Sequence, residues 1–193
     1  MRKTATTVLF ALASLAPALA CAHPQHAGAT FMSGFSHPLL GIDHLLAMIM
    51  VGICAVSVSG RALWVLPSTF LGGLAAGGLI GGAGIAVPLV EPLVAATVLV
   101  LGLIVVLEAR ARLPLSAALV ACFALLHGAA HAAEIRASEA LIAYCAGFIC
   151  ATALLHLAGI AAGHVLRRRP SALRLAVTPV ALTGAWLLLA RLS

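Results

Sequence analysis

Three ionisable residues stand close together at the start of an otherwise apolar stretch, "HPLLGIDHLLAMIMVG" at residues 37–52. They are His37, Asp43 and His44. A charged side chain in the middle of a membrane helix costs about 2.5–3.5 kcal/mol on insertion scales, so ionisable residues in such a segment are candidates for function. Imidazole and carboxylate together form a ligand set for divalent transition metals. The stretch therefore predicts metal chemistry, with Asp43 either a ligand or the group that orients a histidine.

A second group of candidate ligands lies in the stretch "LLHGAAHAAE". His127 and His131 are four residues apart, which places both on one face of a helix, and Glu134 follows just beyond. Two histidines at this spacing can bind one metal ion, as in helical zinc sites. His37 and His44 are seven residues apart, so they share a face as well if their helix reaches back to the "HP" at its start.

The composition indicates a membrane protein. Hydrophobic residues make up 63% of the 193 residues and charged residues 8%, with a mean hydropathy of +1.18. A soluble domain of this size cannot bury so much apolar surface. The net charge of +6 does not indicate nucleic-acid binding, because the arginines lie in short loops between apolar runs and no basic face carries interleaved aromatic residues. We expect an all-α protein whose surroundings are the lipid bilayer.

The first 22 residues resemble a secretory signal peptide, with two basic residues, an apolar stretch and small residues at the end. Cleavage after either Ala20 or Ala22 satisfies the small-x-small pattern. Cleavage after Ala22 would make His23 the first residue, and its free amine and imidazole can chelate one metal ion with His26 nearby. We therefore expect residues 1–22 to be removed as a signal peptide.

Residues 23–193 are expected to form a single domain with about six transmembrane helices, because a span needs about 20 mostly apolar residues. Short breaks with glycine, proline or charge separate the runs. If the mature N-terminus lies in the periplasm, seven arginines fall on the cytoplasmic side and two, Arg136 and Arg191, on the outside. This asymmetry follows the positive-inside rule and predicts a multi-pass protein of the bacterial inner membrane. The runs cover roughly residues 38–58, 63–83, 88–107, 113–132, 140–163 and 172–191.

This topology gathers most histidines and acidic residues at one membrane surface. Six of the eight histidines and four of the five acidic residues fall on the outer side, although the helix assignment did not use the histidines. The sequence therefore predicts a metal site at the periplasmic ends of the first and fourth helices. His156 lies deeper, either as a second site on a transport path or as a buried, hydrogen-bonded histidine. The predicted metal ligands are His23, His26, His37, Asp43, His44, His127, His131 and Glu134.

The same residues carry a family resemblance. The stretches "HPLLGIDHLLAMIMVG" and "LLHGAAHAAE", behind a signal ending in "HPQH", resemble the HupE/UreJ family of nickel permeases over essentially the whole chain. These small bacterial membrane proteins are associated with hydrogenase or urease maturation. The chain has Ala132 where many members have glycine, which leaves the ligands unchanged. The resemblance implies nickel uptake, with functional roles for His37, Asp43, His44, His127, His131 and Glu134.

We expect a permease rather than an enzyme, with Ni²⁺ or Co²⁺ as transported substrate and no tightly bound cofactor. One alternative is an intramembrane metal-dependent hydrolase, but "HGAAH" lacks the glutamate of the H-E-x-x-H motif. Another is a metal-binding accessory protein that does not transport. Besides the metal ion and the lipid, a homo-oligomer or accessory subunits would be compatible partners, and nucleic acid would not.

Overall fold

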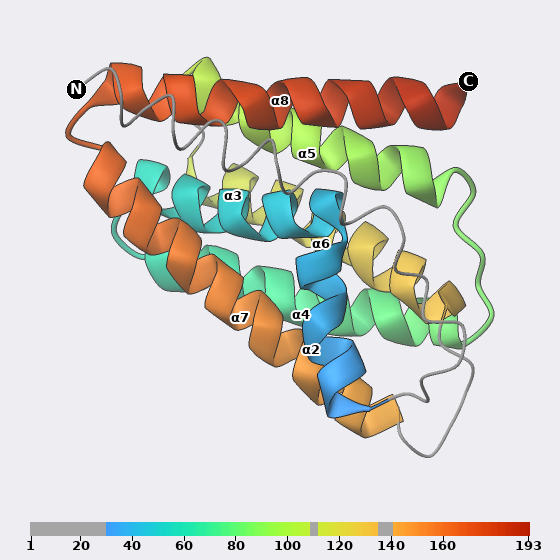
Figure 1. Ribbon diagram of the computed structural model, residues 1–193. Coiled ribbons are helices and arrows are strands. Elements are labelled where there is room, and N and C mark those ends of the chain that lie inside the picture. The colour runs from blue at the N-terminus through green and yellow to red at the C-terminus, as the bar shows by residue number, and fades with distance from the viewer. Residues whose placement is uncertain (1–29, 109–111, 135–140) are drawn as a thin grey trace.

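The computed structural model describes residues 30–108, 112–134 and 141–193. This part of the chain contains helices and no strand, so the predicted all-α fold is confirmed (Figure 1). The expected signal peptide, His23 and His26 lie outside the described residues, and Glu134 is described only as the last residue of its helix. The helices are α2 (Phe31–Leu40), α3 (Ile42–Val58), α4 (Ala62–Gly82), α5 (Val90–Val106), α6 (Leu113–Glu134), α7 (Leu141–Leu166) and α8 (Pro170–Leu192).

The described helices have the length and composition of a multi-pass membrane protein. Four of them, α4, α6, α7 and α8, are long and apolar enough to cross a membrane. The α2–α3 pair adds a fifth span if the two helices are counted together, and α5 is a shorter apolar helix of 17 residues. Helices α4 to α8 coincide with the last five predicted runs to within a few residues.

The first predicted run is not one helix, which corrects the expectation of a single helix starting near His37. α2 begins earlier, at Phe31. Thr30 is its N-cap and forms a reciprocal capping box with Ser33. It is followed by α3 with a bend of 84° at Gly41, whose backbone is extended with ψ of 111°. Pro38 lies in the last turn of α2 rather than at a helix start. The helix ends here because glycine has low helix propensity and Gly41 adopts an extended backbone.

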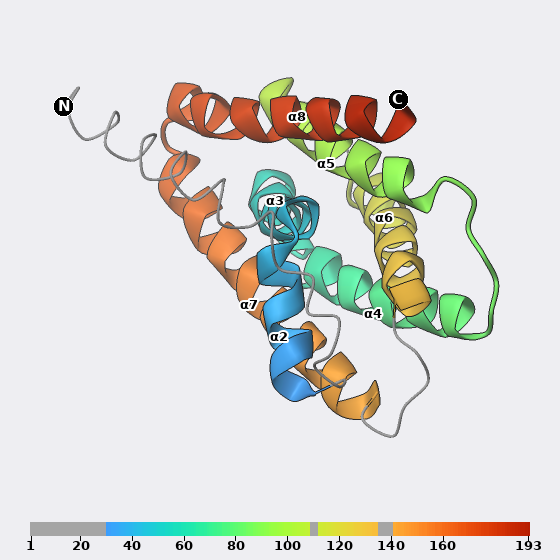
Figure 2. The same ribbon diagram turned by 45° about the vertical axis from the view of Figure 1, so that its right-hand side comes forward.

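The helices pack in close pairs through small residues. α4 lies along α6, α5 along α8, and both α2 and α3 along α7 (Figures 1 and 2). Where α4 meets α6, a side chain at Gly77 would collide with the carbonyl oxygen of Leu125. Where α3 meets α7, a side chain at Gly52 would collide with the carbonyl oxygen of His156. Such close backbone approach is what holds helices together in lipid, and here it fixes the positions of the helices that carry histidines.

The two ends of the bundle carry different polar residues. At one end, which we call the histidine end, the ring of His44 in α3 lies beside that of His131 in α6. At the opposite end, which we call the arginine end, Glu108 after α5 forms an ion pair with Arg174 near the start of α8. The side chain of Arg167, after α7, lines a cavity at the same end. Consecutive helices from α3 to α8 therefore run in alternating directions, as the loop pattern predicted.

Candidate metal-binding site

Four imidazoles, which we call the histidine cluster, meet at the histidine end: His37 from α2, His44 from α3, and His127 and His131 from α6. The ring centroids are 4.3 Å apart for His44–His131 and 5.0 Å for His44–His127. For His37–His131 the distance is 4.6 Å. His127 and His131 are buried, and His44 is 9% exposed. The structure thus brings four of the predicted ligands together, and their binding of a metal ion stays a prediction.

The bend at Gly41 places His37 beside the other rings. Its centroid lies 6.1 Å from that of His44, edge to face. The condition under which these two histidines would share one helix face is not met, because the helix is broken between them. On the α7 side, the rings of Tyr144 and Phe148 lie 6.1 Å and 5.9 Å from His37. Aromatic side chains of α7 therefore border the histidine cluster.

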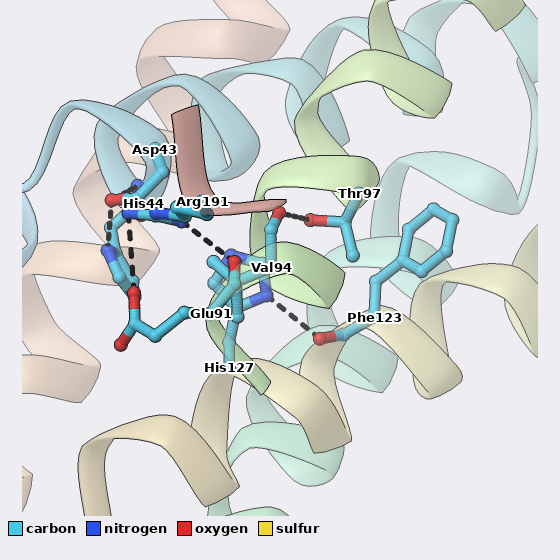
Figure 3. A network of polar contacts seen from close by, with 8 residues as sticks. All are labelled: Asp43, His44, Glu91, Val94, Thr97, Phe123, His127 and Arg191. Atoms are coloured by element: carbon cyan, nitrogen blue, oxygen red, sulfur yellow. Dashed lines mark hydrogen bonds and ion pairs between the residues drawn. The ribbon is translucent and has the colours of Figure 1, made fainter. Parts of the chain in front are cut away.

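Hydrogen bonds fix the orientation of the His44 and His127 imidazoles (Figure 3). His44 Nδ1 lies 2.5 Å from Asp43 Oδ1, and His127 Nδ1 donates to the carbonyl oxygen of Phe123 at 2.9 Å. With the proton on Nδ1, the lone pair of each neutral ring lies on Nε2. Both Nε2 atoms are buried and have no hydrogen-bond partner among the residues that the structure describes. Metal-binding histidines are commonly held in this way through their other ring nitrogen.

Asp43 orients His44 and does not present a free carboxylate. Its Oδ1 accepts from the backbone N–H of His44 at 2.8 Å as well as from the ring, and its Oδ2 accepts from Arg191 Nη2 at 2.7 Å. The carboxylate is buried, and a buried charge needs partners of this kind. Of the two roles predicted for Asp43, the geometry favours the orienting one.

Arg191 and Glu91 belong to the same network, and sequence analysis missed both. Arg191 lies in the last turn of α8, where its Nη1 donates to the carbonyl oxygen of Glu91 at 2.9 Å (Figure 3). Its Nη2 also lies 3.4 Å from Glu91 Oε2. The guanidinium therefore bridges Asp43 of α3 and Glu91 of α5, and its charge offsets theirs. The available signal was an arginine on the predicted outer side, against the positive-inside pattern.

The histidine cluster is not a preset coordination sphere. Among the described residues, no group of three or more His, Cys, Asp or Glu side chains is placed to hold a metal ion. The imidazoles instead meet edge to face, with interplanar angles of 85° for His44–His127 and 89° for His37–His131. A shared ion would therefore require the side chains to rotate within the cluster.

His156 lies deeper in the bundle, on α7. It is 1% exposed, and neither of its ring nitrogens has a hydrogen-bond partner. Of the two alternatives for this residue, the hydrogen-bonded histidine has no support among the described residues, and the second site on a transport path stays a prediction. The ring of Phe70 on α4 contacts it edge to face at a centroid distance of 5.1 Å.

Apolar helices of membrane-spanning length around a buried histidine cluster define a polytopic membrane protein with a polar site in its interior. The family described as HupE / UreJ protein matches residues 10–187. Protein HupE of Rhizobium leguminosarum bv. viciae is 42% identical over 192 residues, which cover 95% of this chain and 96% of the relative. The chain therefore belongs to the HupE/UreJ family, as its motifs predicted. No solved structure matches it.

Proposed function

We propose that this protein takes up divalent nickel, with cobalt as a second substrate, across the bacterial inner membrane. One observation carries the proposal: His44 and His127 hold two buried, unpartnered Nε2 atoms within a single cluster. Imidazole nitrogens suit Ni²⁺, Co²⁺, Zn²⁺ and Cu²⁺ better than Mg²⁺ or Ca²⁺. The resemblance of the motifs to those of nickel permeases favours nickel among these ions.

In this proposal the residues of the site have different tasks. His44 and His127 supply the two unpartnered Nε2 atoms, and side-chain rotation within the histidine cluster brings in nitrogens of His37 and His131. Asp43 keeps the Nδ1 proton of His44 in place. A site assembled in this way binds weakly enough to release the ion again, which transport requires. The remaining predicted ligands, Glu134, His23 and His26, would recruit the ion at the mouth of the site.

The histidine end faces the periplasm in this proposal, and the mature N-terminus lies on the same side. Support comes from the arginines of the opposite end, which a positive-inside orientation places in the cytoplasm. These arginines lie in or beside the connections at the arginine end, and the described ones are Arg61, Arg112, Arg167, Arg168, Arg169 and Arg174.

The site favours transport over hydrolysis. A metal-dependent hydrolase needs a carboxylate that can act as general base on a metal-bound water. Asp43 is held by His44 and Arg191 through both of its oxygens, so it is not available as a base. A metal-binding accessory protein without transport would use the same histidines, and uptake measurements separate it from a permease.

The experiment is accumulation of ⁶³Ni in a bacterium that lacks its own nickel transporters. The wild-type chain should restore accumulation, while His44→Ala and His131→Ala should not. His164→Ala is the matched control, because His164 lies at the arginine end and its Nδ1 donates to the Ile160 carbonyl at 3.0 Å. Immunoblots of membrane fractions establish equal amounts of each variant.

Two results would contradict the proposal. Normal accumulation in both His44→Ala and His131→Ala would show that the site assignment is wrong. Absence of accumulation with the wild-type chain, together with nickel binding to the purified protein, would favour the accessory protein.

A further inference from the structure

Two buried polar side chains on α7 have no hydrogen-bond partner within the described part of the chain. His156 is 1% exposed and Thr152 is 0% exposed, and their ring nitrogens and hydroxyl oxygen are all unpartnered. The two residues are four apart, so they lie on the same helix face one turn from each other. Unsatisfied polar groups inside a membrane protein are costly and frequently mark a path for a substrate or an ion.

One aromatic ring connects this pair to the histidine cluster. The Phe70 ring on α4 has its centroid 5.7 Å from that of His127 and 5.1 Å from that of His156. Phe70 itself is fully buried. The Phe70 side chain therefore contacts both the histidine cluster and His156.

A cavity of about 630 Å³ lies at the arginine end. Its wall includes Cys54 of α3, Leu66 of α4 and Val120 of α6, and its polar residues include Glu108 and Ser116. Leu66 precedes Phe70 by four residues, or one helical turn of about 5.4 Å. The cavity therefore reaches to within about one turn of the ring that contacts both His127 and His156.

We propose that His156 and Thr152 form an inner site for the divalent cation, between the histidine cluster and this cavity. The inference rests on the proposed function and adds a second binding step to it. One imidazole nitrogen and one hydroxyl oxygen bind a transition-metal ion, with water completing the coordination. So few protein donors make the inner site weaker than the histidine cluster, and an ion that reaches it is released toward the cavity. A nitrogen donor also favours Ni²⁺ or Co²⁺ over Mg²⁺ and Ca²⁺.

The decisive variant is His156→Leu in the full chain, with His164→Leu as the matched control on the same helix. Leucine is of similar size and removes an unsatisfied polar group, so a histidine that only fills space should be replaced without loss. In ⁶³Ni uptake we expect His156→Leu to lower the maximal rate about tenfold or more. Loss of a group that only supports a metal ligand typically costs about 10–100-fold in affinity or activity, and loss of the ligand itself should cost at least as much. The KM should stay within about twofold. Calorimetric titration of the purified chain with NiCl₂ should show one bound ion fewer than in wild type. Thr152→Val should give a smaller loss of rate.

Thermal unfolding separates this role from a structural one. His156→Leu should unfold at the wild-type temperature or above, whereas a structural histidine would give a lower midpoint and lower nickel binding throughout. Wild-type uptake rate and wild-type stoichiometry in His156→Leu would overturn the inner site and leave the proposed function intact. A wild-type chain that accumulates no nickel would overturn both.

Discussion

Replacement of Asp43 tests whether this carboxylate prepares His44 for metal binding. Asp43→Asn keeps the volume and a carbonyl oxygen that can accept the Nδ1 proton of His44, but it removes the negative charge. Loss of a group that supports a metal-binding histidine typically weakens affinity 10–100-fold, or about 1.4–2.8 kcal/mol. We expect nickel binding about tenfold weaker in Asp43→Asn and about a hundredfold weaker in Asp43→Ala, which also lacks the acceptor.

The same substitution should lower stability through Arg191. The Asp43 side chain is 6% exposed and that of Arg191 is 25% exposed, with 2.7 Å between Nη2 and Oδ2. Removal of one partner from a fully buried ion pair costs about 3–5 kcal/mol. Arg191 is partly solvated and keeps its contacts with Glu91, so the expected loss is smaller, about 1–2 kcal/mol.

Both effects can be measured on the full chain in detergent, by calorimetric titration with NiCl₂ and by thermal unfolding. Glu108→Gln is the matched control, because Glu108 also pairs with an arginine but is 54% exposed and lies at the arginine end. It should leave nickel affinity within about twofold of wild type. Wild-type affinity in both Asp43 variants would refute the orienting role, and so would an equal loss of affinity in Glu108→Gln.

Three further predictions concern packing, charge and pH. Gly77→Val should destabilise the α4–α6 contact by about 1–3 kcal/mol in thermal unfolding. Gly72→Val is the control and should cause no such loss, because a Cβ at Gly72 meets nothing within 4 Å. Equal losses in the two variants would contradict the packing argument. Arg191→Gln should lower the unfolding midpoint by about 2–8 °C, because Asp43 loses its cation. Glu91→Gln should lower the midpoint less, because Arg191 Nη2 lies 3.4 Å from Glu91 but 2.7 Å from Asp43. A larger loss in Glu91→Gln than in Arg191→Gln would be inconsistent with these distances. Nickel uptake should fall at acidic pH, since imidazole binds metal only when neutral; uptake that is independent of pH over the whole range in which the protein stays folded would contradict capture by imidazole.

Hydropathy alone predicted most of the fold, for a physical reason. An apolar run in lipid must satisfy its own backbone hydrogen bonds, so a run of this length forms a helix whatever its tertiary contacts. The break between α2 and α3 was not predicted. Pro38 is compatible with a helix start as well as with a last turn, and only the capping box at Thr30 and the extended backbone of Gly41 decide between them.

The site was partly predictable from topology. Alternating helix directions were enough to place His44 and His131 at the same end, because that argument needs no side-chain detail. The contact of Arg191 with Asp43 joins residues 148 positions apart in the sequence, and no periodicity or spacing encodes it. The role of Asp43 likewise depends on the partners of its two carboxylate oxygens, His44 and Arg191, which the sequence alone does not show.

The central claim is that imidazoles of the histidine cluster bind the transported ion together. Nickel K-edge X-ray absorption of the full chain, loaded with less than one equivalent of Ni²⁺, tests it most directly. The spectrum should contain the multiple-scattering pattern of more than one imidazole, and this pattern should weaken in His44→Ala and in His127→Ala. A first shell of oxygen atoms alone, or a spectrum unchanged in both variants, would contradict the claim.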